Sequence, residues 1–231
     1  MSFGKTAGFM LAMLGVAALG HAESFEGVAH FKNSMIGGRS SDFEYFIKGD
    51  KARMEVEGEA HGGGKAVIIM DQSVKRMQML MPAQKMAMEF PMGDASDAVK
   101  ERMKEGNIVR SGKTKTILGY TAEQLIAKSD EGETEIWGAK GMGFFGGLHG
   151  RPGTGAPAWA QDLQKQGFFP LLVIHKDAKG QERGRMEATK IEKRSLSDDL
   201  FTVPADFKKF DPAMMRGMGG GPGAGGGGGG Y

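Results

Sequence analysis

The sequence predicts a mainly β (α+β) domain built on a predominantly antiparallel sheet. Short apolar runs recur along the chain, glycine-bearing or polar turns separate most of them, and only two segments have the composition of helices. The chain has 231 residues, of which 40% are hydrophobic. This is enough for one substantial domain with its own core.

The first half of the chain is expected to form a meander of short strands that ends in a hairpin. The hairpin strands, 75–81 and 85–90, bracket Pro82-Ala83-Gln84 in a turn of about four residues. The strands expected before the hairpin are Ser24–Phe31, Phe43–Lys48, Lys51–Glu57 and Ala66–Met70.

Two short helices interrupt the strands of the second half. Asp94–Glu105 has helix formers, an acidic start and a closing glycine, and Ala156–Gln166 spaces Trp159 and Leu163 four residues apart. The strands expected around them are 108–109, 115–118, 122–129, 133–137, 168–175 and 185–193.

The N-terminus has the pattern of a cleavable secretory signal peptide, residues 1–22. Lys5 precedes an unbroken apolar stretch, Ala7–Leu19, and Gly20-His21-Ala22 supplies small residues for cleavage before Glu23. The apolar stretch is shorter than the roughly 20 residues that a membrane anchor needs, which favours cleavage over anchoring. We therefore expect a periplasmic protein that does not span the membrane after cleavage.

Glycine is concentrated in two other places. In the C-terminal segment 217–231, 11 of 15 residues are glycine, a composition that predicts a disordered tail. An internal glycine-rich loop, 138–155, is long enough to be a flap or an insertion. Residues 23–216 are then a single domain.

The hairpin predicts a methionine-lined face. If Met81 pairs with Met86, antiparallel register places Met79 opposite Met88 and Met77 opposite Phe90, with all six side chains on one face. Met54 and Val56 extend this face on a neighbouring strand. The opposite face would carry a mixed surface that water tolerates, formed by Arg76, Gln78, Leu80, Ala87 and Glu89.

Three interpretations of the methionine-lined face remain open. Burying each large apolar side chain is worth roughly 1.5–3 kcal/mol, so something must cover the face. The cover is either one of the two helices, which makes the face ordinary core, or an apolar ligand, around which thioethers re-pack easily. The third interpretation is Cu(I) held by thioethers, although no His or Cys lies within the hairpin.

Composition argues against several functions. The 30 basic and 28 acidic residues are scattered, so there is no dense basic face for nucleic acid. The absence of cysteine excludes disulfide scaffolds, zinc ribbons and thiol nucleophiles. The histidines lack metal-ligand spacing, and the GxGxxG match at Gly141–Gly146 is followed by residues that cannot open a phosphate-binding helix. We therefore expect a non-enzymatic protein without a cofactor or metal.

Several segments resemble an uncharacterised family of exported bacterial domains over roughly residues 24–210. That family is similar to the lipoprotein-carrier superfamily of LolA, LolB and the RseB N-terminal domain. The resemblance implies a curved antiparallel sheet or incomplete barrel, with helices covering the concave face. The segments that carry it are Tyr45–Glu55, Met79–Lys85, Lys113–Glu123, Gly132–Trp137 and Phe201–Phe207.

Together, the residues and the resemblance predict an envelope protein that binds an acyl chain, a lipoprotein or another apolar ligand in its concave face. The ligand-binding residues would be Met54, Val56, Met77, Met79, Met81, Met86, Met88 and Phe90. The alternative is an envelope sensor or protein-interaction module that takes no ligand.

Overall fold

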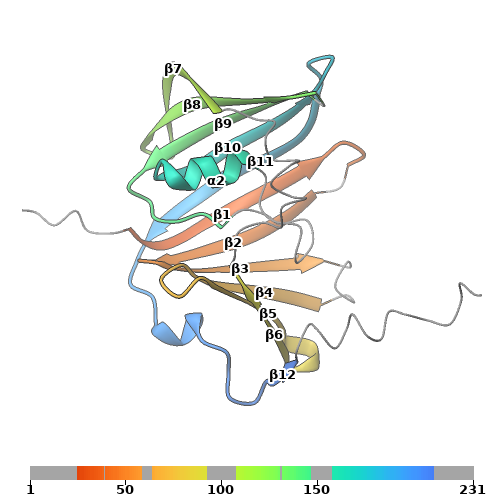
Figure 1. The fold of residues 1–231 in the computed structure, drawn as a ribbon, viewed down its shortest axis with the longest axis vertical. Helices are drawn as coiled ribbons and strands as arrows, with labels where there is room; N and C mark the ends of the chain where they lie inside the picture. Colours follow the sequence, from red (N-terminus) through yellow and green to blue (C-terminus); the bar gives the residue numbers. More distant parts are fainter. Residues whose placement is uncertain are drawn as a thin grey trace, which may run out of the picture.

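The computed structural model describes residues 25–38, 40–58, 64–92, 108–130, 132–146 and 158–210. These residues form one large curved sheet that does not close into a barrel (Figure 1). Its spatial order is β12-β6-β5-β4-β3-β2-β1-β11-β10-β9-β8-β7. All pairings are antiparallel except that of β12 with β6, so the predicted mainly β fold with a curved antiparallel sheet is confirmed.

The first six strands follow one another across the sheet, as the predicted meander requires. Gly49, at φ 57°, turns the chain between β2 and β3, and the Asp71 carboxylate accepts a hydrogen bond from the Ser73 N–H in the turn after β4. The strands are β1 (Glu26–Met35), β2 (Ser40–Lys48), β3 (Lys51–Gly58), β4 (Gly64–Asp71), β5 (Arg76–Met81) and β6 (Met86–Pro91).

The second half starts at the far edge of the sheet and returns to its middle. Leu118 and Gly119 both have positive φ, 50° and 84°, as a two-residue hairpin turn requires. The pairing of β11 with β1 joins the two halves. The strands are β7 (Ile108–Ile117), β8 (Tyr120–Ser129), β9 (Gly132–Lys140), β10 (Phe168–Asp177), β11 (Glu182–Lys193) and β12 (Lys208–Phe210).

The two short strands expected at 108–109 and 115–118 are a single strand, β7. Its pairing with β8 is irregular between Arg110 and Thr114, where Gly112 adopts φ 79°. A bulge of this kind lets the strand continue past a residue that breaks the ladder. The polar stretch that separated the two expected strands is therefore a bulge rather than a loop.

The main core lies on the inner face, which we define as the side of the sheet that carries helix α2 (Ala158–Lys165) (Figure 1). Aromatic rings fill its centre: Phe31 stacks on Phe43 with centroids 4.9 Å apart, and Phe145 lies 5.1 Å from Tyr45 and 5.4 Å from Phe169. These rings come from segments far apart in sequence, so their burial joins both halves of the sheet.

The opposite, outer face of β4–β6 is covered by the segment that follows β11. Leu80 and Ala87 are only 2% and 4% exposed and share a cluster with Leu196 and with Phe201 of the short helix η3 (Asp198–Phe201). Placing Leu80 and Ala87 on a surface open to water is therefore wrong, because a segment remote in sequence shields them. Elsewhere on this face Gln78 donates a hydrogen bond of 3.0 Å to Glu89 at the surface.

The expectation that helices cover the concave face is not supported within the described residues. Helix α2 matches the helix expected at 156–166 but contacts β10, and six strands lie between β10 and β6 in the order of the sheet. Several other expectations lie outside the described residues: the signal peptide at 1–22, the helix at 94–105, residues 147–155 of the glycine-rich loop and the tail at 217–231.

Candidate ligand-binding face

The hairpin of β5 and β6 has the predicted register. Met77 pairs with Phe90, Met79 with Met88, and Met81 with Met86. The short helix η2 (Pro82–Gln84) and Lys85, at φ 49°, form the connecting turn. Because side chains alternate along a strand, all six lie on one face. We call these six side chains the methionine face: Met77, Met79, Met81, Met86, Met88 and Phe90.

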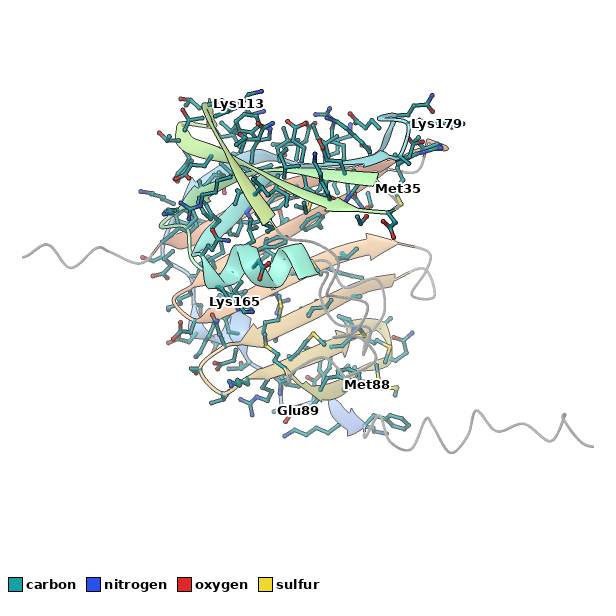
Figure 2. The ribbon with its side chains drawn as sticks, turned by 45° about the horizontal axis from the view of Figure 1, so that its top comes forward. Met35, Met88, Glu89, Lys113, Lys165 and Lys179 are labelled. Atoms are coloured by element: carbon teal, nitrogen blue, oxygen red, sulfur yellow. The ribbon has the colours of Figure 1, made fainter. Side chains whose placement is uncertain are left out.

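The methionine face continues the inner face of the sheet. Tyr45 on β2 pairs with Met54 on β3, and Met54 pairs with Ile68 on β4. Ile68 in turn pairs with Met79, the partner of Met88. An uninterrupted apolar row therefore runs from the aromatic core to the β6 edge, and Figure 2 shows sulfur atoms gathered around Met88 at this end of the sheet.

Burial varies along this surface: Ile68, between Met54 and Met79 in the row, is half-buried, whereas Met88 on β6 is buried. Met54 is 3% exposed and belongs to the core cluster, whereas Val56 only packs against it and is half-buried. Met79 and Met88, at 9% and 7%, are buried outside both apolar clusters of the described residues. The other members of the methionine face, Met77, Met81, Met86 and Phe90, are half-buried.

Residues 138–140 of the expected glycine-rich loop belong to β9, and the residues that follow, 141–146, fill the centre of the inner face. We call residues 141–146 the plug segment, because Phe144 and Phe145 are 6% and 3% exposed within the core cluster. The Tyr45 hydroxyl donates to the Phe144 carbonyl at 3.2 Å and accepts from the Gly146 N–H at 2.9 Å. Burial raises the pKa of the Tyr45 phenol, against the opposing effect of the Gly146 hydrogen bond, so the hydroxyl remains a donor.

Two glycines allow the plug segment to approach the sheet. Gly143 adopts φ 84°, and a Cβ there would lie 2.7 Å from Ile47 Cγ2. A Cβ on Gly146 would overlap the Met70 sulfur. The GxGxxG match therefore serves close packing in this structure, and the centre of the inner face is packed core rather than an open cavity.

Strand β12 borders the edge of the methionine face. Phe210 pairs with Met88 and is half-buried, whereas Lys208 pairs with Met86 and is exposed. The Lys85 ammonium lies 2.8 Å from the Asp206 carboxylate and thereby ties the hairpin turn to the segment before β12. The arrangement places the cation of Lys208 at the rim of an apolar surface.

Polar side chains form a separate hollow of about 450 Å³ on the outer face. His30 Nδ1 lies 3.3 Å from the Glu44 carboxylate at this place. Because the lining mixes charges of both signs, the hollow does not suit an apolar ligand. The charged and polar side chains that line it include His30, Lys32, Asp42, Glu44, Glu55, Lys65, Thr189 and Lys190.

The half-buried carboxylate of Glu135 bonds to side chains on strands β8, β9 and β10. Glu135 accepts hydrogen bonds from Trp137 Nε1 at 2.7 Å, Gln124 Nε2 at 2.9 Å and Lys176 Nζ at 2.8 Å. Burial opposes its charge, but the three donors outweigh burial and lower the pKa of Glu135 to about 2. Sequence reasoning missed this cluster because its members come from three strands and match no motif.

A cation lies over the indole ring of the same cluster. Lys115 Nζ is 4.0 Å from the centroid of the Trp137 ring, and burial lowers the pKa of Lys115. Protein side chains supply the three donors to Glu135, so this carboxylate needs no ligand to balance its charge. Among the described residues no group of His, Asp or Glu side chains is placed to hold a metal ion, and no helix is long and apolar enough to span a membrane.

Residues 25–207 match the family described as Domain of unknown function (DUF4412). No curated protein matches the sequence. The structure of PNGF-II is similar, with a TM-score of 0.51 and 15% identity over 84% of this chain and 32% of that one. This likeness supports the fold alone, and the chain spans about a third of PNGF-II.

Two further solved structures match this chain at low identity. One is an uncharacterized conserved protein from Thermus thermophilus, with a TM-score of 0.49 and 10% identity over 82% of this chain and 92% of that one. The other is a chain of the Pseudomonas aeruginosa MucA/MucB complex, with a TM-score of 0.47 and 13% identity over 81% of this chain and 58% of that one.

Proposed function

The chain belongs to the DUF4412 family, and we propose that it is an exported, periplasmic and non-enzymatic protein that binds an acyl chain, a lipoprotein or another apolar ligand on the methionine face. The observation that carries this proposal is that Met81 and Met86, next to the hairpin turn, are half-buried on a face that continues the apolar core. A surface continuous with the core but incompletely buried gains free energy when an apolar partner covers it.

The size of the gain suits an acyl chain. Each buried CH₂ contributes roughly 0.8 kcal/mol, so a chain of about 14 carbons gains on the order of 10 kcal/mol before entropy costs. Micromolar binding corresponds to about 8 kcal/mol net, so a gain of at least this order is needed before entropy costs are subtracted. Methionine side chains adapt to irregular guests because they are unbranched and have three rotatable bonds.

The rim of the methionine face offers a cation for the polar end of an acyl ligand. Lys208 is exposed beside Met86, and its ammonium makes no ion pair with any described residue. An acyl ligand that ends in a carboxylate or phosphate can lie on the methionine face with its anionic end at Lys208. Because this contact is exposed, it orients the ligand and adds little affinity.

The test is a titration of the wild-type protein and of Met79→Glu with a fluorescent fatty-acid probe. Met79 lies in the middle of the apolar row and is 9% exposed. A carboxylate there either ionises at high cost or takes up a proton, and we expect the dissociation constant for the probe to rise at least tenfold. Met86→Glu, nearer the edge, gives the same test at a half-buried position where the new charge can stay hydrated.

Gln72→Glu is the matched control, because it adds the same charge to an exposed turn at the end of β4. Circular dichroism and thermal melting establish that each variant is folded. If the wild type does not bind the probe and Met79→Glu cannot fold, the methionine face is packed core and the proposal is wrong. The protein is then better regarded as an interaction module that takes no ligand.

A further inference from the structure

We propose that the methionine face also holds a soft monovalent metal ion, Cu(I) or its chemical analogue Ag(I), between the thioethers of Met79, Met81, Met86 and Met88. This inference goes beyond apolar-ligand binding, because it depends on sulfur rather than on apolar surface. It rests on the register of the hairpin and on the charges around it.

The register brings the four sulfur-bearing side chains together. Met79 lies directly opposite Met88, and Met81 directly opposite Met86. Directly opposite Cβ atoms in an antiparallel pair are roughly 4.5–5.5 Å apart, and side chains two residues apart along a strand are separated by roughly 7 Å. Methionine has three rotatable side-chain bonds, so four thioethers within this small rectangle can converge on one ion.

The chemistry of the face selects the metal. Neutral thioethers are soft ligands that suit Cu(I), whereas Zn²⁺ and Mg²⁺ require nitrogen, thiolate or oxygen ligands. No histidine, aspartate or glutamate of the described residues shares the rows of Met79–Met88 and Met81–Met86. The cation beside them is Lys208, next to Met86, and its exposed side chain can turn toward solvent.

The burial of the four methionines provides both a pocket and an entry. Met79 and Met88 are 9% and 7% exposed, so a metal ion between them would be largely shielded from water. Met81 and Met86 are half-buried and lie next to the hairpin turn. An ion can therefore meet the outer pair first and then the inner pair.

The experiment replaces the four methionines together by leucine, Met79→Leu, Met81→Leu, Met86→Leu and Met88→Leu, in the full-length protein. Leucine conserves the volume and apolar character of methionine but removes the sulfur. We expect Ag(I) in chloride-free buffer, followed by calorimetry, to bind the wild type and to bind the quadruple variant at least tenfold more weakly. Competition between each protein and a chromogenic chelator for Cu(I) should show the same ratio of affinities.

Met186→Leu is the matched control, because it removes a core sulfur on β11, away from the hairpin, and should leave Ag(I) affinity unchanged. Methyl NMR of methionine-labelled protein should show Ag(I)-dependent shifts of four signals that the quadruple variant lacks. Undiminished Ag(I) affinity in the quadruple variant, or no binding by the wild type, overturns the inference. Titration of the quadruple variant with the fatty-acid probe separates metal binding from acyl-chain binding, because leucine removes the sulfur atoms but preserves an apolar surface.

Discussion

Replacing Tyr45 by phenylalanine tests whether the plug segment is held in the inner face by a single oxygen. The Tyr45 hydroxyl serves two backbone groups, the Phe144 carbonyl at 3.2 Å and the Gly146 N–H at 2.9 Å. Phenylalanine retains the ring contacts with Phe145 and Phe169 but leaves both backbone groups without this partner. The substitution therefore isolates the hydrogen bonds from the packing.

The expected loss of stability follows from the cost of unsatisfied buried groups. Each buried donor or acceptor that loses its partner costs roughly 1–3 kcal/mol, so loss of both partners should lower the free energy of unfolding by about 2–6 kcal/mol. For a domain of this size, 1 kcal/mol lowers Tm by about 2–4 °C, and we expect a decrease of about 4–24 °C. Hydrogen exchange of the Gly146 amide should accelerate by more than that of amides in β2.

Thermal and urea unfolding of Tyr45→Phe and of Tyr120→Phe provide the measurement and its control. Tyr120 is half-buried at the start of β8, and its hydroxyl makes no hydrogen bond with a described residue, so removal of this hydroxyl should change Tm little. A Tyr45→Phe protein that melts within about 2 °C of the wild type, with unchanged exchange at Gly146, would refute the role assigned to the hydroxyl.

Two further predictions concern the Glu135 cluster and the outer face. Because the folded pKa of Glu135 is about 2, below its unfolded value, the stability it contributes is present above pH ~4.5 and is lost as the pH falls toward 2. Between these pH values the free energy of unfolding of the wild type in urea should fall by roughly 1–3 kcal/mol more than that of Glu135→Gln. Parallel plots of this free energy against pH for the two proteins would contradict the lowered pKa of Glu135. Phe201 is 6% exposed and shares a cluster with Leu80, so Phe201→Ala should lower the free energy of unfolding in urea by roughly 3–5 kcal/mol. The segment after β11 should also become sensitive to proteolysis. A loss under about 1 kcal/mol would show that this segment does not cover the outer face.

The sequence predicted the elements that depend on neighbouring residues. The pairing of Met79 with Met88 followed from the alternation of side chains and from a short turn with proline at its start, which together leave one register. The meander of β1–β6 and helix α2 were also predicted, because their patterns depend on residues that are close in sequence. The curvature of the sheet came from the family resemblance, because no local pattern encodes it.

The features that the sequence did not predict depend on contacts between remote segments. The Tyr45 hydroxyl and the Phe144 carbonyl are 99 residues apart, and nothing near Tyr45 indicates a partner in a glycine-rich loop. Leu80 and Ala87 alternate with polar residues as a solvated face would, and only the segment that carries Leu196 shows that they are buried. The bulge in β7 was missed because Ser111, Gly112 and Lys113 have the composition of a turn.

The packed centre of the inner face determines how this protein can bind a ligand. Tyr45, Phe31 and Phe145 already occupy the space over β1 and β2, so a ligand held there would have to displace the plug segment and its two hydrogen bonds. The methionine face has half-buried members and needs no such rearrangement. A ligand that lies along β5 and β6 leaves the core intact, and substitutions in the two regions should therefore act on different quantities. Changes around Tyr45 should lower the free energy of unfolding, whereas changes at Met81 or Met86 should alter ligand affinity with little loss of stability.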